Sequence, residues 1–395
     1  MIKRKKKNKE HNPFYDPTLK KRHLSAKRFK KFTLTSLIFS VAFLAFFLFD
    51  MIGKGIPAFN IAYIKVDVTF NEKTLEDTRF AVPTEYRNLV SRAALRDLPK
   101  LLEENPTYMN STQNIWILAS SQVDQYIKNH NHNLKDKDIA KVDELYAQGL
   151  IDKKFNAIFF ENGDSKIPEY AGIFSAVIGS ILTLIITMAV AFPIGVMTAI
   201  YLEEFAGDNK FTRFIEININ NLAAIPSILF GLLGLAIFIN LFGMPRSSPL
   251  VGGLTLALMT LPIIIVSSRA ALRAVPDSIR QAGYGLGLNK IQVTRDHVLP
   301  LAFPGIMTGS IIGLAQAMGE TAPLIIIGMI AFIPDAPSMV TQAATVMPAQ
   351  LFTWAGMPEG MYIEKTAAGI LVLLTILISL NAIAIYLRKK LEVKW

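Results

Sequence analysis

Apolar stretches with at most one charged residue recur along the chain, and each is long enough to predict a helix that spans a membrane. The first stretch, Phe32–Phe49, contains 18 uncharged residues, which is close to the minimum needed to cross the hydrocarbon core of a bilayer. Five further stretches occupy residues 171–200, 218–245, 247–268, 305–334 and 367–387. The pattern predicts an all-α polytopic membrane protein with six transmembrane helices.

Residues 55–170, between the first and second stretches, have the composition of a soluble domain. Apolar and polar residues alternate over 64–70, which predicts a strand with one buried face. Apolar residues at helical spacing predict an amphipathic helix over 86–98. Further helices are expected at 115–127 and 138–150, and a closing strand at 155–160. An interval of this length can bury a core of its own, so we expect a small α+β domain.

Basic residues predict the orientation of the chain in the membrane. Residues 1–31 hold 13 Lys and Arg, and a basic segment directly before an apolar span lies on the cytoplasmic side. This orientation puts the polar connection 269–304, with five basic and two acidic residues, in the cytoplasm and the α+β domain outside. We therefore expect a multi-pass protein of the cytoplasmic (inner) membrane with both termini in the cytoplasm. The expected domains are a basic tail (1–31), a first anchor (32–54), an extracytoplasmic domain (55–170) and a membrane core (171–390).

The formal net charge of +10 is concentrated in the basic tail, and the rest of the chain is close to neutral. Such a tail suits an anionic lipid surface. No aromatic and basic platform accompanies the tail, so nucleic acid is not an expected partner. The sequence contains no cysteine, which excludes a disulfide, a thiol nucleophile and a thiolate metal site. His130 and His132 lie near several aspartates, but we interpret this run as a solvated loop rather than a metal site.

The longest polar interval of the second half, residues 269–304, predicts two short helices joined at a glycine. Pro276 and Asp277 suit the first turn of a helix. Apolar residues then recur at helical spacing, Gly287 ends the helix, and Asn289 can cap the next one. Two helices that meet at an angle between membrane spans form a knob suited to docking.

Three groups of residues in this interval are spaced in a recognisable way: Gln281-Ala282-Gly283, then Gly287, then Leu299-Pro300. The spacing resembles the cytoplasmic coupling loop of type I ABC-importer permeases, in which Glu-Ala-Ala precedes a glycine and a later Leu-Pro. Gln281 replaces the usual Glu, Gly283 replaces an Ala, and His297 replaces an aliphatic residue. The run from Gly319 to Leu324, Gly-Glu-Thr-Ala-Pro-Leu, is similar to the phosphate-specific branch of that family. The resemblance covers residues 171–390.

The resemblance implies a permease subunit that imports inorganic phosphate and is not itself an enzyme. The chain has no Gly-x-x-x-x-Gly-Lys-Ser/Thr loop, and ATP and Mg²⁺ would be bound by separate ATP-binding subunits. Those subunits would contact the first helix of the knob through polar side chains and small residues, namely Arg280, Gln281, Ala282, Gly283 and Gly287. The other implied partners are a second related permease chain and an external phosphate-binding protein. Another oxyanion such as sulfate or molybdate, or a membrane sensor with an external domain, remains as an alternative.

Glu320 is the only charged residue within its apolar stretch. An ionised carboxylate there is expensive and is usually paired, protonated or directed at a pathway; packing and gating remain alternative roles. Gln316, four residues earlier, shares a helix face with Glu320 and can donate to it, and Thr308 lies on the same face. Arg269 ends a preceding span, either as an anchor in the interface or as an anion contact. The sequence thus predicts Thr308, Gln316, Glu320, Thr321 and Arg269 near the translocation pathway.

Overall fold

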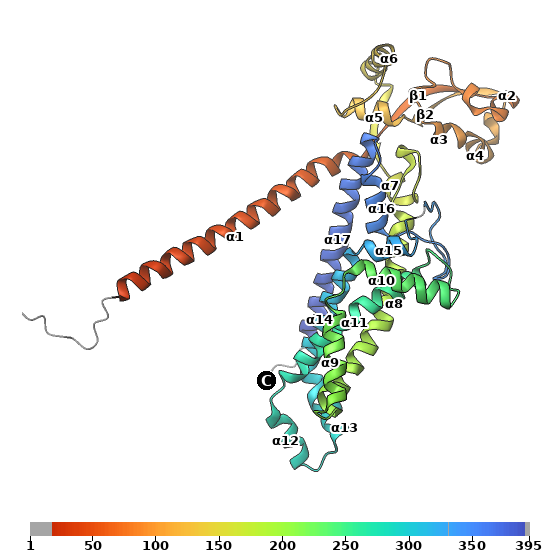
Figure 1. Cartoon of the computed structure of the whole chain (residues 1–395). Helices are drawn as coiled ribbons and strands as arrows, with labels where there is room; N and C mark the ends of the chain where they lie inside the picture. The colour runs from red at the N-terminus through yellow and green to blue at the C-terminus, as the bar shows by residue number, and fades with distance from the viewer. Residues whose placement is uncertain (1–17, 331, 392–395) are drawn as a thin grey trace, which may run out of the picture. The chain divides into compact units, whose positions relative to one another are not determined.

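The structure of this chain, a computed structural model, describes residues 18–330 and 332–391. It separates into two compact units, residues 1–53 and 54–395. In the described part of the first unit, one helix, α1 (Leu19–Gly55), contains the whole first apolar stretch (Figure 1). This helix begins within the expected basic tail, so that the last basic residues of the tail are already helical. Residues 1–17 of the tail lie outside the described residues.

The second unit contains the expected α+β domain, whose sheet has three antiparallel strands in the order β2-β1-β3. The strands are β1 (Asn60–Phe70), β2 (Ser111–Leu118) and β3 (Ile151–Phe155). The helices are α2 (Glu72–Glu76), α3 (Arg92–Arg96), α4 (Leu98–Glu104), α5 (Ser121–Ile127) and α6 (Asp136–Ala147). The alternating residues of β1 bury one face against these helices, as the sequence predicts.

Two of the helices expected in this domain differ from the structure. The helix expected over 86–98 begins only at Arg92, because Ser91 caps α3 by accepting a hydrogen bond from the amide of Ala93 at 3.2 Å. The helix expected over 115–127 is wrong in its first part, because residues 115–118 complete strand β2 beside β1. The expected closing strand is also misplaced, since β3 ends at Phe155 and a helical turn follows.

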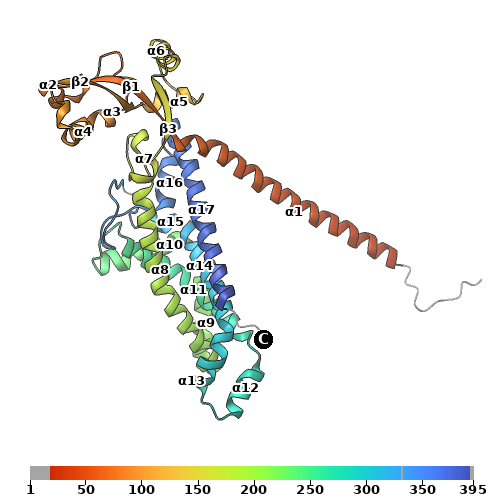
Figure 2. The ribbon, with the colours of Figure 1, turned by 180° about the vertical axis from the view of Figure 1, so that it is seen from behind.

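Five helices of the described residues are long and apolar enough to cross a membrane, and a bent pair can supply a sixth. The five are α1, α8 (Phe174–Ile200), α11 (Pro249–Arg273), α14 (Leu299–Gly319) and α17 (Gly360–Leu391). Figure 2 shows α8, α11, α14 and α17 running alongside one another. Small residues let α11 approach its neighbours closely, for example Gly253 of α11 against Ile186 of α8. The prediction of a polytopic helical protein with a small α+β domain is confirmed.

Two of the six apolar stretches are interrupted rather than straight. The stretch 218–245 contains the end of α9 (Lys210–Leu222), then α10 (Ser227–Gly234) and the π-helical segment η6 (Leu235–Leu241), with a bend of 104° at the break. The stretch 305–334 is likewise not one helix. Its helix, α14, ends at Gly319, and only the short α15 (Ala322–Ile326) follows before an irregular segment.

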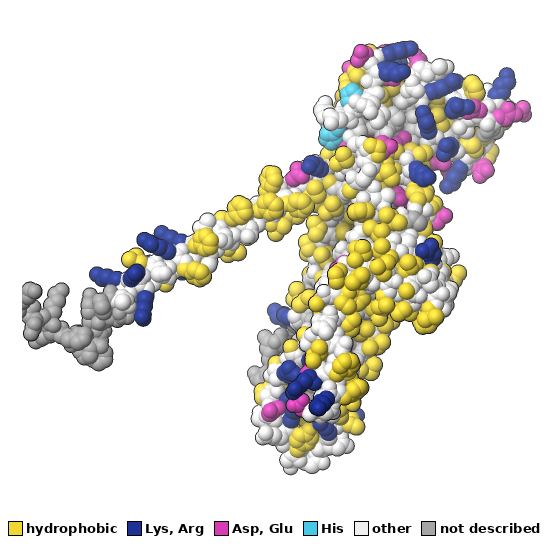
Figure 3. Space-filling model, viewed as in Figure 1, with side chains coloured by type: hydrophobic (Ala, Val, Ile, Leu, Met, Phe, Trp, Pro, Cys, Tyr) yellow, Lys and Arg dark blue, Asp and Glu magenta, His cyan; other side chains and the backbone are white. Residues whose placement is uncertain are grey.

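The α+β domain is joined to the membrane core by a buried junction. Its short elements are η1 (Ile56–Phe59), α7 (Ile158–Glu161), η4 (Pro168–Tyr170) and α16 (Met347–Ala355). Trp354 is buried among aromatic residues and donates its indole N–H to Asp164 at 2.8 Å. Lys365 of α17 donates to the carbonyl oxygens of Glu169 and Ala171. Figure 3 shows charged side chains gathered at the two ends of this unit, with apolar side chains over the helices between them.

Candidate functional site

The first candidate region is the knob at the end of the core opposite the sheet, built on helix α12 (Asp277–Gly285). Its C-terminus closes with a Schellman motif, in which the amide of Leu288 donates to the Gly283 carbonyl and the amide of Gly287 donates to the Tyr284 carbonyl. Gly287 has a φ of +79°, a conformation that other residues adopt only with strain. The prediction that Gly287 terminates this helix is confirmed.

The knob returns to the membrane through α13 (Lys290–Gln292) and the π-helical segment η7 (Val293–Val298), which continues into α14. Asn289 caps α13 by accepting from the amide of Gln292 at 2.9 Å, as predicted. Helix α12 packs across η7 at Gly283, where an added Cβ would lie 2.8 Å from Val293 Cγ2. The structure therefore requires a very small residue at this crossing.

Arg280 fixes the knob to the rest of the chain. Its side chain is 16% exposed and forms an ion pair at 2.6 Å with Glu204, which lies in η5 (Tyr201–Phe205) at the end of α8. It also donates to the carbonyl oxygens of Val275 at 2.7 Å and Leu272 at 3.0 Å. The hydrogen bonds to Glu204 raise the pKa of Arg280 above its ordinary value. The expectation that Arg280 contacts a partner stays a prediction, and its donors are engaged within the chain.

The outer face of the knob is exposed and largely apolar. Gln281 and Ala282 are exposed, and Leu286 and Ile291 are 79% and 63% exposed. A hollow of about 310 Å³ lies between α12 and the start of α14. It is lined by Ile279, Ala282, Gly283, Leu286, Asp296, His297, Pro300 and Leu301. Unlike Arg280, Gln281 and Ala282 are therefore available to a partner.

Arg269 does not lie near Glu320 but belongs to a charge cluster at the knob end of the bundle. Its guanidinium contacts Glu203 at 3.3 Å and Glu216 at 2.5 Å, and its side chain is 13% exposed. Arg273 forms a second ion pair with Glu203 at 2.7 Å. Two carboxylates thus lie against Arg269, and its role as an anchor or as an anion contact stays a prediction.

The second candidate region is the break between α14 and α15. Glu320 has an extended backbone (φ −77°, ψ 128°) directly after Gly319, the last residue of α14. The predicted shared helix face of Gln316 and Glu320 is therefore wrong, because the helix ends between them. Gln316 is exposed and Glu320 is half-buried. Among the described residues, neither side chain has a hydrogen bond or ion pair within the chain, and both are open to a partner or a pathway.

Thr308 and Thr321 lie at different depths of the core. Thr308, on α14, donates to the carbonyl of Pro304 at 2.8 Å and accepts a hydrogen bond from Arg388 Nη1 at 3.0 Å. Thr321 precedes α15 within the break. Arg388 is thus a cation beside a predicted pathway residue that sequence reasoning did not identify, because it comes from α17, 80 positions away in the chain.

The two interrupted segments pack against each other. Gly231 of α10 faces Pro323 of α15, so closely that a Cβ at Gly231 would lie 2.7 Å from Pro323 Cα. Irregular backbone within a membrane protein is tolerated where it is buried in protein or lines a water-filled cavity. Helix α15, which follows the break that holds Glu320, is therefore packed against α10.

A third charged cluster joins the α+β domain to α17, centred on the buried side chain of Glu364. It accepts hydrogen bonds from Gln125 at 2.6 Å and from Lys128 at 3.1 Å, and it contacts His130 Nδ1 at 2.5 Å. Burial raises the pKa of Asp124, which forms an ion pair with Lys128 at 2.6 Å. The interpretation of the His130 run as a solvated loop is therefore incomplete, since His130 takes part in this junction.

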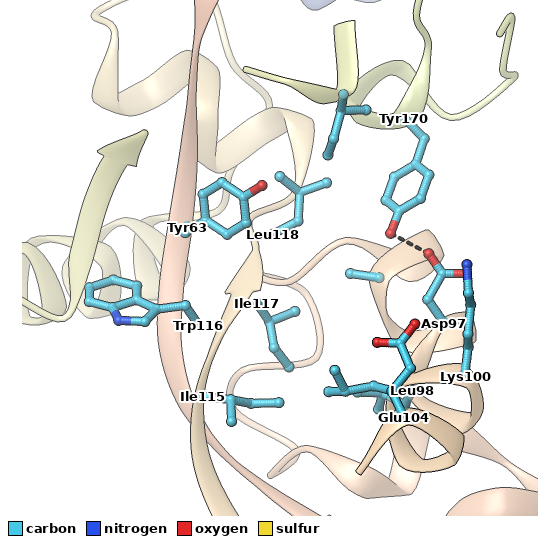
Figure 4. A pocket seen from close by; sticks show the side chains of 13 residues that line it. Tyr63, Asp97, Leu98, Lys100, Glu104, Ile115, Trp116, Ile117, Leu118 and Tyr170 are labelled. Carbon is cyan, nitrogen blue, oxygen red and sulfur yellow. Dashed lines mark hydrogen bonds between the residues drawn. The ribbon is translucent and has the colours of Figure 1, made fainter. Parts of the chain in front are cut away.

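A hollow of about 310 Å³ lies on the other side of the same junction (Figure 4). Figure 4 shows Tyr170 reaching from η4 to Asp97, which accepts its hydroxyl hydrogen bond at 2.5 Å. Burial and this hydrogen bond raise the pKa of Tyr170 above its ordinary value. Ile115 and Ile117 of β2 line the opposite wall. The junction thus contains polar contacts on two sides, at Glu364 and at Asp97.

A bundle of apolar helices with an exposed helix pair at one end is typical of the membrane subunit of a transporter, and the family comparison agrees. The chain belongs to the family of binding-protein-dependent transport system inner membrane components, whose model matches residues 191–393. A domain of unknown function (DUF3333) matches residues 16–85 and 81–136. The resemblance to type I ABC permeases that the knob residues carry is therefore confirmed.

Individual relatives are named for phosphate transport. The chain is 36% identical over 160 residues to the phosphate transport system permease protein PstA of Mycobacterium leprae, covering 40% of this chain and 52% of that protein. It is 30% identical over 245 residues to PstA of Yersinia pestis, covering 61% of this chain and 81% of that protein. The chain spans about half the length of the mycobacterial relatives it matches.

Two further similar proteins are ABC transporter components that are not named PstA. A probable ABC transporter permease protein of Bacillus subtilis, YqgI, is 33% identical over 168 residues, covering 42% of this chain and 56% of that protein. An inward-facing structure of the MetNI methionine ABC transporter has a TM-score of 0.45 and 16% identity, covering 56% of this chain and 98% of that chain.

Proposed function

We propose that this chain is the membrane-spanning permease subunit of an ABC importer that translocates inorganic phosphate and is driven by separate ATP-binding subunits. The observation that carries the proposal is the α12 knob, an exposed helix fixed at its base by Arg280. The relatives named as phosphate transport permeases support the choice of substrate. The chain itself catalyses no reaction in this proposal, and ATP and Mg²⁺ are bound by the partners.

The knob is built to transmit a movement of its partner to the spans. Arg280 connects α12 to Glu204 at the end of α8, and η7 continues without interruption into α14. A displacement of α12 therefore acts on two spans at once. Exposed apolar side chains at the tip, above all Leu286, supply the contact area that a groove of the ATP-binding subunit would bury.

The exposed face of α14 supports a second, related permease chain as partner. Ile312, Gln316 and Gly319 recur on this face at helical spacing and are exposed, and Glu320 follows directly. A primary amide and a carboxylate are costly against lipid tails, and such groups usually face a bundle interior or a water-filled path. In the proposed assembly, the second permease covers this face and the translocation pathway runs between the two chains.

Phosphate is an anion, so its pathway requires positive charge to balance Glu320. Arg388 beside Thr308 is one cation placed on the inner face of the core, and the partner permease is the expected source of others. We place the α12 knob, Arg388 and both termini in the cytoplasm, and the α+β domain outside. An external phosphate-binding protein would deliver the substrate on that outer side.

The test is uptake of labelled phosphate by proteoliposomes that hold this chain with its partner permease, ATP-binding subunits and phosphate-binding protein. We expect ATP-dependent uptake of phosphate and not of sulfate or molybdate. Leu286→Glu should abolish uptake and association with the ATP-binding subunit, because it places a charge at the apolar tip. Tyr146→Glu is the matched control, since Tyr146 is a 55% exposed residue of α6 in the external domain.

Each alternative predicts a different result in the same assay. Uptake of sulfate or molybdate in place of phosphate would retain the architecture and replace the substrate. Normal ATPase association in Leu286→Glu would reject the docking role of the knob. If no oxyanion is taken up by the complete assembly, the importer proposal fails and a sensory role of the external domain has to be considered.

A further inference from the structure

All four arginines of the external domain line a single hollow. Residues 55–170 contain four arginines and ten lysines, and the hollow, of about 690 Å³, contains every one of these arginines and none of the lysines. It lies between η2 (Thr78–Ala81) and α3. The arginines that line it are Arg79, Arg87, Arg92 and Arg96. Such a segregation of arginine from lysine indicates a requirement for the guanidinium group and not merely for positive charge.

One carboxylate lines the hollow, and it neutralises only one arginine. Asp77 contacts Arg79 through two oxygens, with distances of 2.9 Å to Nε and 2.6 Å to Nη2. The hydrogen bonds from Arg79 lower the pKa of Asp77 to about 2. No other acidic side chain lines the hollow among the described residues. Four guanidinium groups and one carboxylate leave an excess of three positive charges.

The remaining three arginines have no ion pair with a carboxylate among the described residues. The guanidinium of Arg87 lies 4.9 Å from the centre of the Phe80 ring, and its Nε donates to the Val82 carbonyl. Arg92 and Arg96 are exposed at positions i and i+4 of α3, where like charges destabilise a helix. The helix tolerates this repulsion although no carboxylate among the described residues forms an ion pair with either arginine, which is expected if an external anion relieves it.

Guanidinium groups bind phosphate oxygens with two parallel hydrogen bonds, a geometry that ammonium groups cannot offer. The volume of the hollow falls in the range of small-molecule sites and exceeds the needs of one inorganic phosphate. We propose that this hollow is a binding site for a multiply charged phosphate compound of the pyrophosphate or tripolyphosphate class. The phosphates are provided either by a soluble compound or by the headgroups of anionic lipids.

This site is separate from the proposed pathway, and its test requires no transport. The full chain is placed in phosphatidylcholine nanodiscs and titrated by calorimetry with tripolyphosphate, pyrophosphate, inorganic phosphate and sulfate at constant ionic strength. We expect tripolyphosphate to bind at least tenfold more tightly than sulfate. The double variant Arg92→Gln/Arg96→Gln should weaken tripolyphosphate binding at least tenfold.

Two further double variants control for charge and for folding. Lys135→Gln/Lys137→Gln removes the same charge from exposed positions of the same domain outside the hollow and should leave binding unchanged. Arg92→Lys/Arg96→Lys keeps the charge but removes the guanidinium groups, and it should weaken binding severalfold while its thermal unfolding matches the parent. Equal losses in the Lys135/Lys137 variant, or full binding in the Gln variant, would overturn the proposal.

Titrations in nanodiscs of a second lipid distinguish the two sources of the phosphate groups. If lipid headgroups occupy the hollow, phosphatidylglycerol nanodiscs should weaken tripolyphosphate binding to the parent severalfold and leave the residual binding of the Gln variant unchanged. If the ligand is soluble, both nanodiscs should give the same affinity. If tripolyphosphate does not bind, and the Gln variant loses association with the external binding protein, the proposal is overturned. The hollow would then be a contact surface for that protein. All of these results are independent of whether phosphate is transported.

Discussion

The two ends of the membrane core are each organised around one charged side chain, but of opposite sign and different setting. At the knob, Arg280 contacts Glu204 and two backbone carbonyls. At the α+β domain, Glu364 is 5% exposed and contacts Gln125, Lys128 and His130. Both side chains connect an element that protrudes from the core to a helix within it.

The Arg280 contact and the Glu364 contact differ in the groups that form them. A guanidinium stays protonated in proteins, so the fixation of the knob by Arg280 is insensitive to pH in the physiological range. The contact at the α+β domain is instead shared among several side chains, because Glu364 contacts Gln125, Lys128 and His130. The comparison indicates a connection that depends on one guanidinium at the knob and one that is shared among several side chains where the α+β domain meets α17.

The largest expected effect comes from Arg280→Ala. It leaves the Glu204 side chain, which is 4% exposed, buried without its partner, and removal of one member of such a pair typically costs about 3–5 kcal/mol. We expect a marked fall in the melting temperature of the purified chain and loss of coupling to the ATP-binding subunits. Arg280→Lys is the control, because it keeps the charge and should retain part of the stability. An unchanged melting temperature in Arg280→Ala would show that the knob is fixed by packing alone.

Glu364→Ala should have a smaller effect, about 2–3 kcal/mol, because Lys128 keeps its ion pair with Asp124 at 2.6 Å. The loss should be local and should appear as faster hydrogen exchange over α5. Glu364→Gln keeps an acceptor but not the charge, and it should fall between the parent and the alanine variant. If Glu364→Ala exchanges as slowly as the parent, the junction depends on Trp354 and its aromatic neighbours instead.

Two glycines of α12 test how tightly the knob is packed. Gly283→Ala should cost about 1–3 kcal/mol, because the new Cβ would lie 2.8 Å from Val293 Cγ2. Gly285→Ala is the matched control, since nothing lies within 4 Å of its Cβ position, and it should stabilise the chain by about 0.5–1 kcal/mol through helix propensity. Equal melting temperatures for the two variants would contradict the packing of α12 on η7.

The sequence predicted what depends on neighbouring residues and missed what depends on distant ones. The caps at Gly287 and Asn289 follow from local chemistry and were correct. The partner of Arg280 lies 76 positions away, and that of Gln125 lies 239 positions away; no local pattern connects them. The sequence pattern predicts helix for residues 115–118, because a short apolar run does not distinguish a helix from a strand. Pairing with β1 decides its conformation.

The interrupted helices show a further limit. The helices α9 and α14 end at Leu222 and Gly319, each four residues before a proline, which is where the proline ring would clash with the helix carbonyl. The signal for the break beside Glu320 was therefore in the sequence. Pro193, however, lies inside the continuous helix α8, so a proline alone does not decide whether a membrane helix ends.

The smallest expected effect is a pH dependence of stability that comes from Asp164, at the junction between the α+β domain and the membrane core. Burial raises the pKa of Asp164 above its ordinary value of 3.8, so the folded state binds this proton more strongly than the unfolded state. Its contribution to stability is complete below the unfolded pKa and is lost as the pH rises through the higher folded pKa. Asp164→Asn keeps the acceptor for the indole of Trp354 and should therefore narrow the difference in melting temperature between acidic and neutral pH. An unaltered difference in this variant would contradict a contribution of Asp164 to the pH dependence of stability.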